Sequence, residues 1–240
     1  MALTRTFGAL SALDGVSLSV TSRTRHAVIG PNGAGKTTLF NVITGQVPPS
    51  GGHVLFEGRP VTGLPPHAVA RRGISRSFQR TNLFLKLSVL ENLRLAAAAD
   101  GRGSWSLFGQ VDRLRAPLAR AMETAEAVGL RERLSATAGA LSYGEQRQLE
   151  VGVALATRPT LLLLDEPTAG MSPEETQRMT RMLEGLPREV TLLIIEHDMD
   201  VVGSLADRVT VLHYGEVLTE GTFDHVKRDP RVYEVYLGSA

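Results

Sequence analysis

Short apolar runs and amphipathic segments alternate along this chain. Predominantly apolar runs are typical of strands that are covered on both faces, and such runs occupy 25–29, 161–164 and 191–195. Apolar residues recur at helical spacing in 39–43 and in 173–186. Buried strands that alternate with helices predict an α/β fold, in which a mostly parallel sheet carries helices on both faces.

Shorter elements are predicted between these segments. Residues 51–63 alternate and turn like a small antiparallel hairpin, and 209–218 forms a second hairpin near the end of the chain. We also expect strands at 17–20 and 74–79 and a short helix at 66–72. These elements add an antiparallel β part to the parallel sheet.

The middle of the chain has a different pattern. From 89 to 134, Ala-rich and Leu-rich helical patterns dominate, strand patterns are absent, and a glycine-containing loop at 100–105 interrupts the helices. We therefore expect residues 84–158 to form a helical lobe inserted into a core that is made by 1–83 and 159–240. A chain of 240 residues is long enough for one such domain with its inserted lobe.

A glycine-rich segment joins the first apolar run to the helix that follows it. Its sequence is Gly30-Pro31-Asn32-Gly33-Ala34-Gly35-Lys36-Thr37, followed by Thr38, and it matches the phosphate-binding pattern G-x-x-x-x-G-K-[ST]. Glycines allow successive backbone N–H groups and a helix N-terminus to point at one anion. Lys36 is then expected beside the β- and γ-phosphates of a nucleotide, and the Thr37 hydroxyl is expected to bind Mg²⁺. The strand-to-helix setting disfavours the alternative, an ordinary glycine-rich turn.

Two carboxylates, Asp165 and Glu166, follow the second apolar run. Ligands of open α/β sheets bind beyond the carboxyl ends of the strands, so both side chains are expected beside the phosphate loop. Asp165 suits a role in holding Mg²⁺ opposite Thr37, and Glu166 is placed to accept a proton from an attacking water. The alternative is that the pair ends the strand and caps a turn before Pro167, which the neighbouring phosphate loop disfavours.

A third group of residues, Ser142, Gly144 and Glu145, precedes the acidic strand. Ser142 at a helix N-cap, Gly144 for close approach and free N–H groups together favour a second phosphate site. Ser142 and Glu145 also match a capping box, and both interpretations hold together because the cap preorganises the same helix end. One chain cannot easily direct this helix and the phosphate loop at one nucleotide, which indicates that two chains share it.

Composition limits the classes of function. The 26 basic and 25 acidic residues leave a formal charge of +1, which gives no support for nucleic-acid binding. The chain has no cysteine, so it forms neither disulfides nor thiolate metal sites. The apolar runs are far too short to span a bilayer, and the first residues lack the layout of a signal peptide. If the protein acts at a membrane, we expect it to do so through a membrane-bound partner.

These motifs, in this order, resemble the nucleotide-binding subunit of ATP-binding cassette (ABC) transporters over nearly the whole chain. Gly30 to Thr37 resembles the Walker A motif, Leu161 to Glu166 the Walker B motif with its catalytic glutamate, and Leu141 to Glu145 the signature LSGGQ. The resemblance implies a P-loop NTPase (RecA-like) core with an antiparallel β subdomain and an inserted α-helical lobe. It also implies an enzyme that hydrolyses ATP with Mg²⁺.

Three further positions match motifs of this family. Phe78 and Gln79 resemble the Q-loop, His197 lies in a segment like the switch-histidine region, and Phe7 matches the aromatic residue that stacks on adenine. The resemblance implies that Gln79 orients water and Mg²⁺ and reports to the helical lobe, and that His197 senses the γ-phosphate. The alternatives are a solvated strand end for Gln79 and a locally bonded strand-end histidine for His197.

Finer detail resembles the LivG-type branch, which energises branched-chain amino acid importers. The matching segments are Gly30 to Asn41, Ser77 to Leu93, Ile195 to Met199 and Val235 to Gly238. This resemblance implies a dimer of cassettes, either two copies or a heterodimer, that closes on two ATP molecules. It also implies two transmembrane permease subunits, a periplasmic solute-binding protein and a peripheral place at the cytoplasmic face of the inner membrane. A permease's coupling helix is expected in a groove of the helical lobe near Gln79.

The chain departs from the common family pattern at the signature and after the acidic strand. Tyr143 and Glu145 replace a glycine and the glutamine of the signature, and Ser172 replaces an aspartate that many cassettes have at this position. Relatives usually also have a longer first strand before the position of Phe7.

Several functions stay open within and beyond this family. A cassette for lipopolysaccharide export shares the Tyr-Leu-Gly ending, although the strand end at Phe78 and Gln79 favours the importer. Soluble cassettes of DNA repair or translation usually carry a long coiled coil or a second cassette, and 240 residues provide neither. The Ser142 helix and Glu166 argue against a P-loop kinase, because they serve ATP hydrolysis at a shared site and not the binding of an acceptor. The solute, whether an amino acid, urea, an amide or an aromatic acid, is chosen by other subunits and not by this chain.

Overall fold

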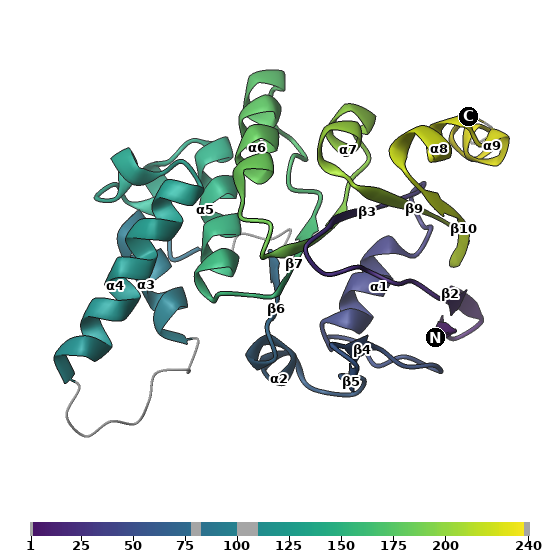
Figure 1. The fold of residues 1–240 in the computed structure, drawn as a ribbon, viewed down its shortest axis with the longest axis horizontal. Coiled ribbons are helices and arrows are strands. Elements are labelled where there is room, and N and C mark those ends of the chain that lie inside the picture. The colour runs from purple at the N-terminus through teal and green to yellow at the C-terminus, as the bar shows by residue number, and fades with distance from the viewer. Residues whose placement is uncertain (1, 78–82, 100–109, 238–240) are drawn as a thin grey trace.

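A six-stranded sheet forms the centre of the molecule (Figure 1). The computed structural model describes residues 2–77, 83–99 and 110–237. The strands are β3 (Arg25–Ile29), β6 (Ile74–Ser77), β7 (Leu161–Asp165), β8 (Thr191–Ile195), β9 (Arg208–His213) and β10 (Glu216–Gly221). Their order is β10-β9-β3-β8-β7-β6, with β10 antiparallel to β9 and all other neighbours parallel.

Both faces of the sheet are buried at β7 and β8, which explains why these two strands are apolar without alternation. Leu163 of β7 belongs to a hydrophobic cluster with Phe40, whereas the next residue, Leu164, belongs to a cluster on the opposite face with Leu183. All four side chains are fully buried. The prediction of a mostly parallel sheet that is covered on both faces is confirmed.

Helices cover the sheet from both sides. The covering helices are α1 (Lys36–Ile43) and α2 (Pro66–Arg71) on one face, and α5 (Tyr143–Ala156), α6 (Pro173–Gly185) and α7 (Met199–Leu205) on the other. Near the C-terminus, α8 (Phe223–Arg228) packs against β9 and β10, and α9 (Pro230–Leu237) packs against β10. α6 begins at Pro173 because Ser172 caps it and a proline at the first position loses no helical hydrogen bond.

The antiparallel part consists of two short hairpins. β1 (Leu3–Phe7) pairs with β2 (Leu10–Val16), and β4 (Leu55–Phe56) pairs with β5 (Arg59–Pro60). The turn residues of the second hairpin, Glu57 and Gly58, have φ of 49° and 74°, and two positive φ angles are what a tight two-residue turn requires. The hairpins predicted at 51–63 and 209–218 are confirmed by β4–β5 and β9–β10.

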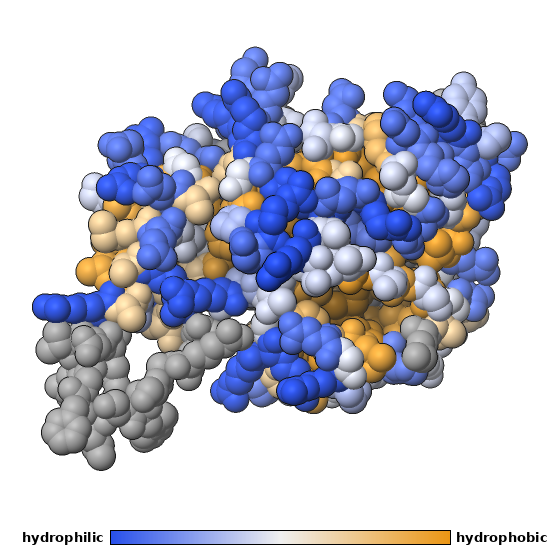
Figure 2. All heavy atoms as spheres, viewed as in Figure 1, coloured by the Kyte–Doolittle hydropathy of each residue, from blue (hydrophilic) through white to orange (hydrophobic). Residues whose placement is uncertain are grey.

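One predicted strand, at 17–20, is wrong. In the structure β2 ends at Val16, and residues 17–20 after it form no strand. Leu18 and Val20 instead line an apolar pocket of about 550 Å³ beside α1 and β4, which Figure 2 shows as an orange hollow to the lower right of centre. An alternating pattern indicates which side chains are buried against apolar groups. It does not show whether a neighbouring strand is present to pair with the segment, and here none is.

Helices also form the part of the chain between β6 and β7. α3 (Val89–Ala99), α4 (Gln110–Ala127) and α5 enclose a cluster of their own that includes Leu93, Ala125 and Leu149. Two 3-10 helices, η1 (Arg131–Arg133) and η2 (Ala138–Ala140), connect α4 to α5. Within 83–99 and 110–158 the structure has no strand, and the loop predicted at 100–105 lies outside the described residues. In the described ranges no helix is both long and apolar enough to cross a membrane.

Asn92 ties the segment before α3 to that helix. Its buried side chain donates to the carbonyl oxygens of Phe84 (3.1 Å) and Ser88 (2.9 Å) and accepts from the Phe84 N–H (2.9 Å). We predict that Asn92→Ala lowers the free energy of unfolding by about 2–3 kcal/mol, because it removes three hydrogen bonds of a buried side chain and leaves the Phe84 N–H without this partner. Urea unfolding measures the loss, with Glu91→Ala at the exposed neighbouring position as control. Equal stabilities of the two variants would contradict this prediction.

Candidate functional site

The carboxyl ends of three adjacent parallel strands meet at one edge of the sheet. The register pairs Val28 of β3 with Ile195 of β8, and pairs Ile195 with Asp165 of β7. These residues therefore form one row across the sheet, and the segments that follow them leave the sheet side by side. Those segments begin at Gly30, Glu166 and Glu196.

The loop from Gly30 to Lys36 is held in place by close backbone packing. A side chain at Gly30 would bring its Cβ within 2.2 Å of the Leu212 carbonyl oxygen, and one at Gly35 within 2.4 Å of the Ala12 carbonyl oxygen. Both glycines also have positive φ, 147° and 101°. Because L residues with side chains rarely adopt such angles, the first and last glycines of the pattern serve packing against β9 and β2.

The N-terminus of α1 has no side-chain cap. Gly35 occupies the N-cap and has no side chain, so no side-chain cap satisfies the first backbone N–H groups of the helix. A Cβ added at Gly33 would meet no atom within 4 Å, so space is open beside the loop. Unsatisfied N–H groups at a positive helix end fit a phosphate group. Of the other loop residues, Asn32 and Thr37 are exposed, Pro31 and Thr38 are half-buried, and Ala34 is buried.

Lys36 bonds to the loop itself in this structure. Its Nζ donates to the carbonyl oxygens of Gly30 (2.6 Å) and Pro31 (2.9 Å), and the side chain is buried. Burial lowers the pKa of Lys36 below its ordinary value, and the carboxylates of Glu166 and Asp165 oppose that shift. An ammonium group makes stronger hydrogen bonds to an anion than to neutral carbonyl oxygens. Lys36 is therefore suited to exchange these carbonyls for a phosphate.

Asp165 is held by Arg76, a residue that the sequence analysis did not single out. The Arg76 guanidinium, on β6, donates to Asp165 Oδ2 (2.5 Å) and to the side-chain oxygen of Asn41 (2.7 Å). The side chains of Arg76 and Asp165 are only 6% and 1% exposed, so losing one partner would leave an uncompensated buried charge. A signal was present in the sequence, because an arginine within a short buried strand needs a carboxylate partner.

The second carboxylate oxygen of Asp165 fits a cation. Asp165 Oδ1 is buried and has no hydrogen-bond partner within the described part of the chain. A buried anionic oxygen without a partner is costly, and a bound cation offsets that cost. In 2–77, 83–99 and 110–237 no cluster of three or more acidic, histidine or cysteine side chains could hold a metal. One carboxylate and the Thr37 hydroxyl instead suit Mg²⁺, which commonly takes its other ligands from substrate phosphates and water.

Glu166 and His197 lie close together at the edge of the site. The distance from Glu166 Oε1 to His197 Nδ1 is 3.9 Å, which is longer than a hydrogen bond, and the two side chains are 28% and 62% exposed. Glu166 has φ of 48°, a left-handed conformation that is uncommon for residues other than glycine. Its N–H donates to the Ile195 carbonyl oxygen at 2.9 Å, and this bond holds the bend that follows β7.

A buried carboxylate, that of Glu196, connects the segments after β7 and β8. Glu196 Oε1 accepts from the N–H (3.1 Å) and the hydroxyl (2.6 Å) of Thr168, and Oε2 accepts from the His197 N–H (3.1 Å). The side chain is fully buried, so these bonds balance the desolvation of its charge. Glu196 lies within the matching segment Ile195 to Met199 but had no predicted role of its own, and Thr168 was not predicted to belong to the site.

The predicted capping box at the start of α5 is present. The Ser142 hydroxyl accepts from the Glu145 N–H (3.2 Å), and the Glu145 carboxylate accepts from the Ser142 N–H (2.9 Å). The Gly144 N–H donates to Glu175 Oε1 of α6 at 3.2 Å. The bond from Gly144 to Glu175 joins α5 to α6, and Figure 1 shows α5 and α1 on either side of β6 and β7. The fold of one chain therefore does not bring Ser142 and Gly144 to Lys36.

The remaining predicted site residues are Phe7 and Gln79. Phe7 ends β1 with 46% of its surface exposed, and the Arg5 guanidinium lies 4.3 Å from the centre of its ring. Its role in stacking on adenine stays a prediction. β6 ends at Ser77, and both Phe78 and Gln79 lie outside the described residues.

The packing of Gly35 gives a direct test of the loop. We predict that Gly35→Ala lowers the free energy of unfolding by about 2 kcal/mol or more, through its positive φ and the close Ala12 carbonyl, and that it weakens binding of a fluorescent ATP analogue. Gly185→Ala is the matched control, because an added Cβ meets no atom within 4 Å there and alanine favours a helix. Urea unfolding and analogue titration measure both effects. Wild-type binding by Gly35→Ala would show that the loop tolerates a side chain.

Comparison with known proteins relates this geometry to one family. A family model described as ABC transporter matches residues 13–169. The chain is 41% identical to the high-affinity branched-chain amino acid transport ATP-binding protein BraF of Pseudomonas aeruginosa, over 99% of this chain and 96% of that protein. It is 38% identical to the corresponding LivG protein of Escherichia coli, over 98% of this chain and 94% of that protein.

Solved structures agree with the sequence comparisons. An ATP-binding cassette of an ABC transporter in its ADP conformation matches with a TM-score of 0.84 at 34% identity, covering 99% of this chain and 96% of that one. A dimeric bacterial ABC transporter cassette matches with a TM-score of 0.77 at 27% identity, covering 92% and 97%. The predicted P-loop NTPase fold is confirmed. Since the fold, the family model and full-length relatives agree, this chain belongs to the ABC transporter family as an ATP-binding cassette.

Proposed function

We propose that this chain hydrolyses ATP to drive an importer of branched-chain or other hydrophobic amino acids. The observation that carries the proposal is the meeting of the phosphate loop, Asp165, Glu166 and His197 at adjacent strand ends. Support for the solute comes from relatives whose names describe branched-chain amino acid transport. Import of urea, amides or aromatic acids is the alternative, because other subunits choose the solute.

The chain's own groups bind the triphosphate. Backbone N–H groups of the phosphate loop and the positive end of α1 bind phosphate oxygens, and Lys36 exchanges its two carbonyl partners for the β- and γ-phosphates. Phe7 stacks on the adenine. Thr37, Asp165 and Gln79 would hold Mg²⁺, which when bound neutralises charge on the phosphates.

Glu166 is the general base in this proposal. Its carboxylate accepts a proton from water while the water oxygen bonds to the γ-phosphorus and the bond from that phosphorus to the bridging oxygen of ADP breaks. His197 lies within 3.9 Å of Glu166 and donates a hydrogen bond to the same phosphate. Glu196 holds the backbone of His197 in place during this step.

A second cassette completes the site. Because the start of α5 stands apart from α1 within one chain (Figure 1), Ser142 and Gly144 contact ATP that is bound to the phosphate loop of another cassette. A related cassette has been solved as a dimer, which supports this arrangement. Closure requires Glu175 to release the Gly144 N–H, since a carboxylate and a phosphate would compete for the same donor. The partner is a second copy or a related cassette.

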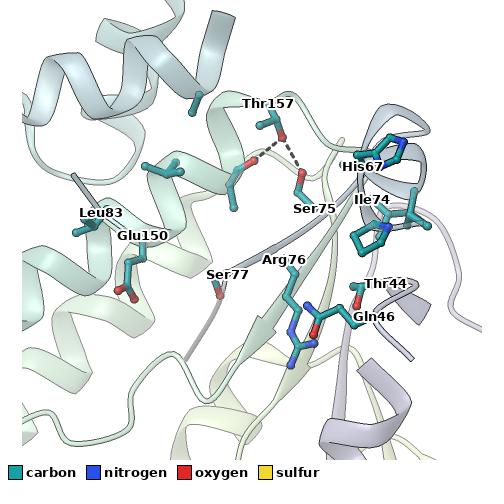
Figure 3. A pocket seen from close by; sticks show the side chains of 16 residues that line it. Thr44, Gln46, His67, Ile74, Ser75, Arg76, Ser77, Leu83, Glu150 and Thr157 are labelled. Carbon is teal, nitrogen blue, oxygen red and sulfur yellow. Dashed lines mark hydrogen bonds between the residues drawn. The ribbon is translucent and has the colours of Figure 1, made fainter. Parts of the chain in front are cut away.

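A groove between the helical lobe and the sheet is the proposed docking site for a transmembrane permease. Its volume is about 430 Å³, and its walls come from α2, β6, α3 and α5. Figure 3 shows Leu83 and Glu150 on the lobe side and Thr44, Gln46 and His67 on the opposite side. Its mostly apolar lining suits the apolar face of an amphipathic helix.

In the complete transporter, each part of this chain and each other subunit has its own role. Residues 84–158 act as the helical lobe that receives the permease, and 1–83 and 159–240 act as the ATPase core. With two permease subunits bound, the cassettes are peripheral subunits at the cytoplasmic face of the inner membrane. A periplasmic solute-binding protein delivers the solute, and no nucleic acid takes part.

The variant Glu166→Gln tests the base and the shared site together. We predict that it binds Mg-ATP, hydrolyses it at least about 100-fold more slowly than the parent, and shifts from monomer to dimer when Mg-ATP is added. Phosphate release measures turnover, and light scattering after size-exclusion chromatography measures the mass. Glu174→Gln, an exposed glutamate in the first turn of α6, is the control.

Each measurement has its own contrary result. Near-parent turnover would remove Glu166 as the base. An unchanged mass, with ATP binding demonstrated separately, would mean that this chain does not pair with itself.

Solute uptake tests the transport function. We predict that cells carrying the complete transporter lose uptake of radiolabelled leucine when the cassette carries Glu166→Gln, because import then lacks its energy source, and that the Glu174→Gln control retains it. The same cells are assayed with labelled urea and a labelled aromatic acid. Loss of urea or aromatic-acid uptake with intact leucine uptake would support the alternative solutes instead.

A further inference from the structure

A line of polar side chains runs along α5 from the groove toward the segment that follows β7. It begins at Glu150, which lines the groove although its side chain is only 7% exposed (Figure 3). Arg147, one turn earlier on α5, is 12% exposed and donates from Nη1 to Glu150 Oε2 at 2.9 Å. The pair keeps its geometry because either side chain alone would be a nearly buried, unpaired charge.

Tyr143 extends this line to the start of α5. Its hydroxyl accepts a hydrogen bond from Arg147 Nε (3.1 Å) and donates one to the Ala169 carbonyl oxygen (2.9 Å). The Arg147 guanidinium also lies over the Tyr143 ring, 5.5 Å from its centre. Burial acts to lower the pKa of Arg147, but hydrogen bonds to Glu150 and Tyr143 raise it above its ordinary value. The guanidinium therefore stays charged, and both of its hydrogen bonds are charge-assisted.

Ala169 belongs to the segment that carries the proposed base. Its N–H donates to the Glu166 carbonyl oxygen (3.1 Å). The preceding residue, Thr168, donates to Glu196, which accepts in turn from the His197 N–H. Through these hydrogen bonds, a displacement of Ala169 shifts the backbone of both Glu166 and His197.

We propose that Tyr143 is a positioning residue through which an occupant of the groove moves residues 166–169 and so changes the rate of ATP hydrolysis. The proposal rests on the proposed function of the groove as a docking site. An occupant that contacts Glu150 changes the geometry of its ion pair with Arg147. The Arg147 guanidinium then shifts, which changes its hydrogen bond to the Tyr143 hydroxyl and, through that hydroxyl, the bond to the Ala169 carbonyl oxygen. The signature of the family has glycine where this chain has Tyr143, and glycine has no side chain to make these contacts.

A second contact at the same helix end does not use this line. The Gly144 N–H donates to Glu175 of α6, and neither group contacts Arg147 through a hydrogen bond in the described residues. Tyr143→Phe therefore removes the side-chain route and leaves the contact between α5 and α6 in place. The ring of phenylalanine also preserves the packing of the tyrosine ring against Gly170.

The absence of cysteine from the chain makes a direct test practicable. Val153→Cys places one thiol on the groove wall, where a bulky maleimide label occupies the groove without any other subunit. We predict that labelling changes kcat for Mg-ATP hydrolysis by about fivefold, the effect of one hydrogen bond of typical net strength. When Tyr143→Phe is also present, labelling is expected to leave kcat nearly unchanged. KM for ATP is expected to change little in either protein, because the label does not touch the phosphate loop.

The comparison uses the ratio of labelled to unlabelled kcat within each protein, so effects of the substitutions on basal rate or folding cancel. Tyr233→Phe, at a tyrosine of α9 that is 68% exposed, is the matched control and should keep the full response. Equal responses with and without Tyr143→Phe would overturn the proposal, because the groove would then act by another route. No response in the Val153→Cys protein would overturn it as well. A failed leucine-uptake test leaves these ratios unaffected, so the two proposals fail separately.

Discussion

The register of three parallel strands is the constraint on which the site depends. Hydrogen bonding of β3 to β8 and of β8 to β7 places Val28, Ile195 and Asp165 in one row, so that segments far apart in sequence leave the sheet together. A shift of β7 by one residue would move Asp165 to the other face of the sheet. It would also exchange Leu163 and Leu164 between two apolar clusters. The buried leucines of β7 therefore hold the strand-end carboxylates in place.

Charges buried at this edge are balanced by directed hydrogen bonds. Asp165 shares one oxygen with Arg76, Glu196 accepts from Thr168 and His197, and Lys36 donates to two carbonyl oxygens of its own loop. Each arrangement offsets the cost of removing a charge from water. Within the described residues, the other oxygen of Asp165 has no hydrogen-bond partner, and the N-terminus of α1 has no side-chain cap. These groups have the polarity that a cation and a phosphate require, so the fold itself leaves room for the charges of a magnesium nucleotide.

The helix α5 links the two cores of the molecule. Val151 and Ala154 pack into the cluster beneath the sheet, whereas Leu149 packs into the cluster of the helical lobe. Packed interiors are stiff, so a helix that is shared by two cores transmits the movement of one to the other. Its first turn carries Ser142 and is bonded to the segment after β7 through Tyr143. A change in the lobe thus reaches both the signature end of α5 and the strand ends of the site.

Sequence alone determined the local elements and their chemistry, and the tertiary structure decided their partners. The apolar runs at 161–164 and 191–195 and the capping box at Ser142 depend on residues within about four positions of one another, and the structure contains them. The strand predicted at 17–20 is absent because pairing needs a neighbouring strand, which local alternation does not supply. The bonds from Arg76 to Asp165, from Thr168 to Glu196 and from Tyr143 to Ala169 span 89, 28 and 26 positions along the chain. Their roles came to light only with the tertiary structure, since the packing of the sheet and of α5 is what brings these pairs within hydrogen-bond distance.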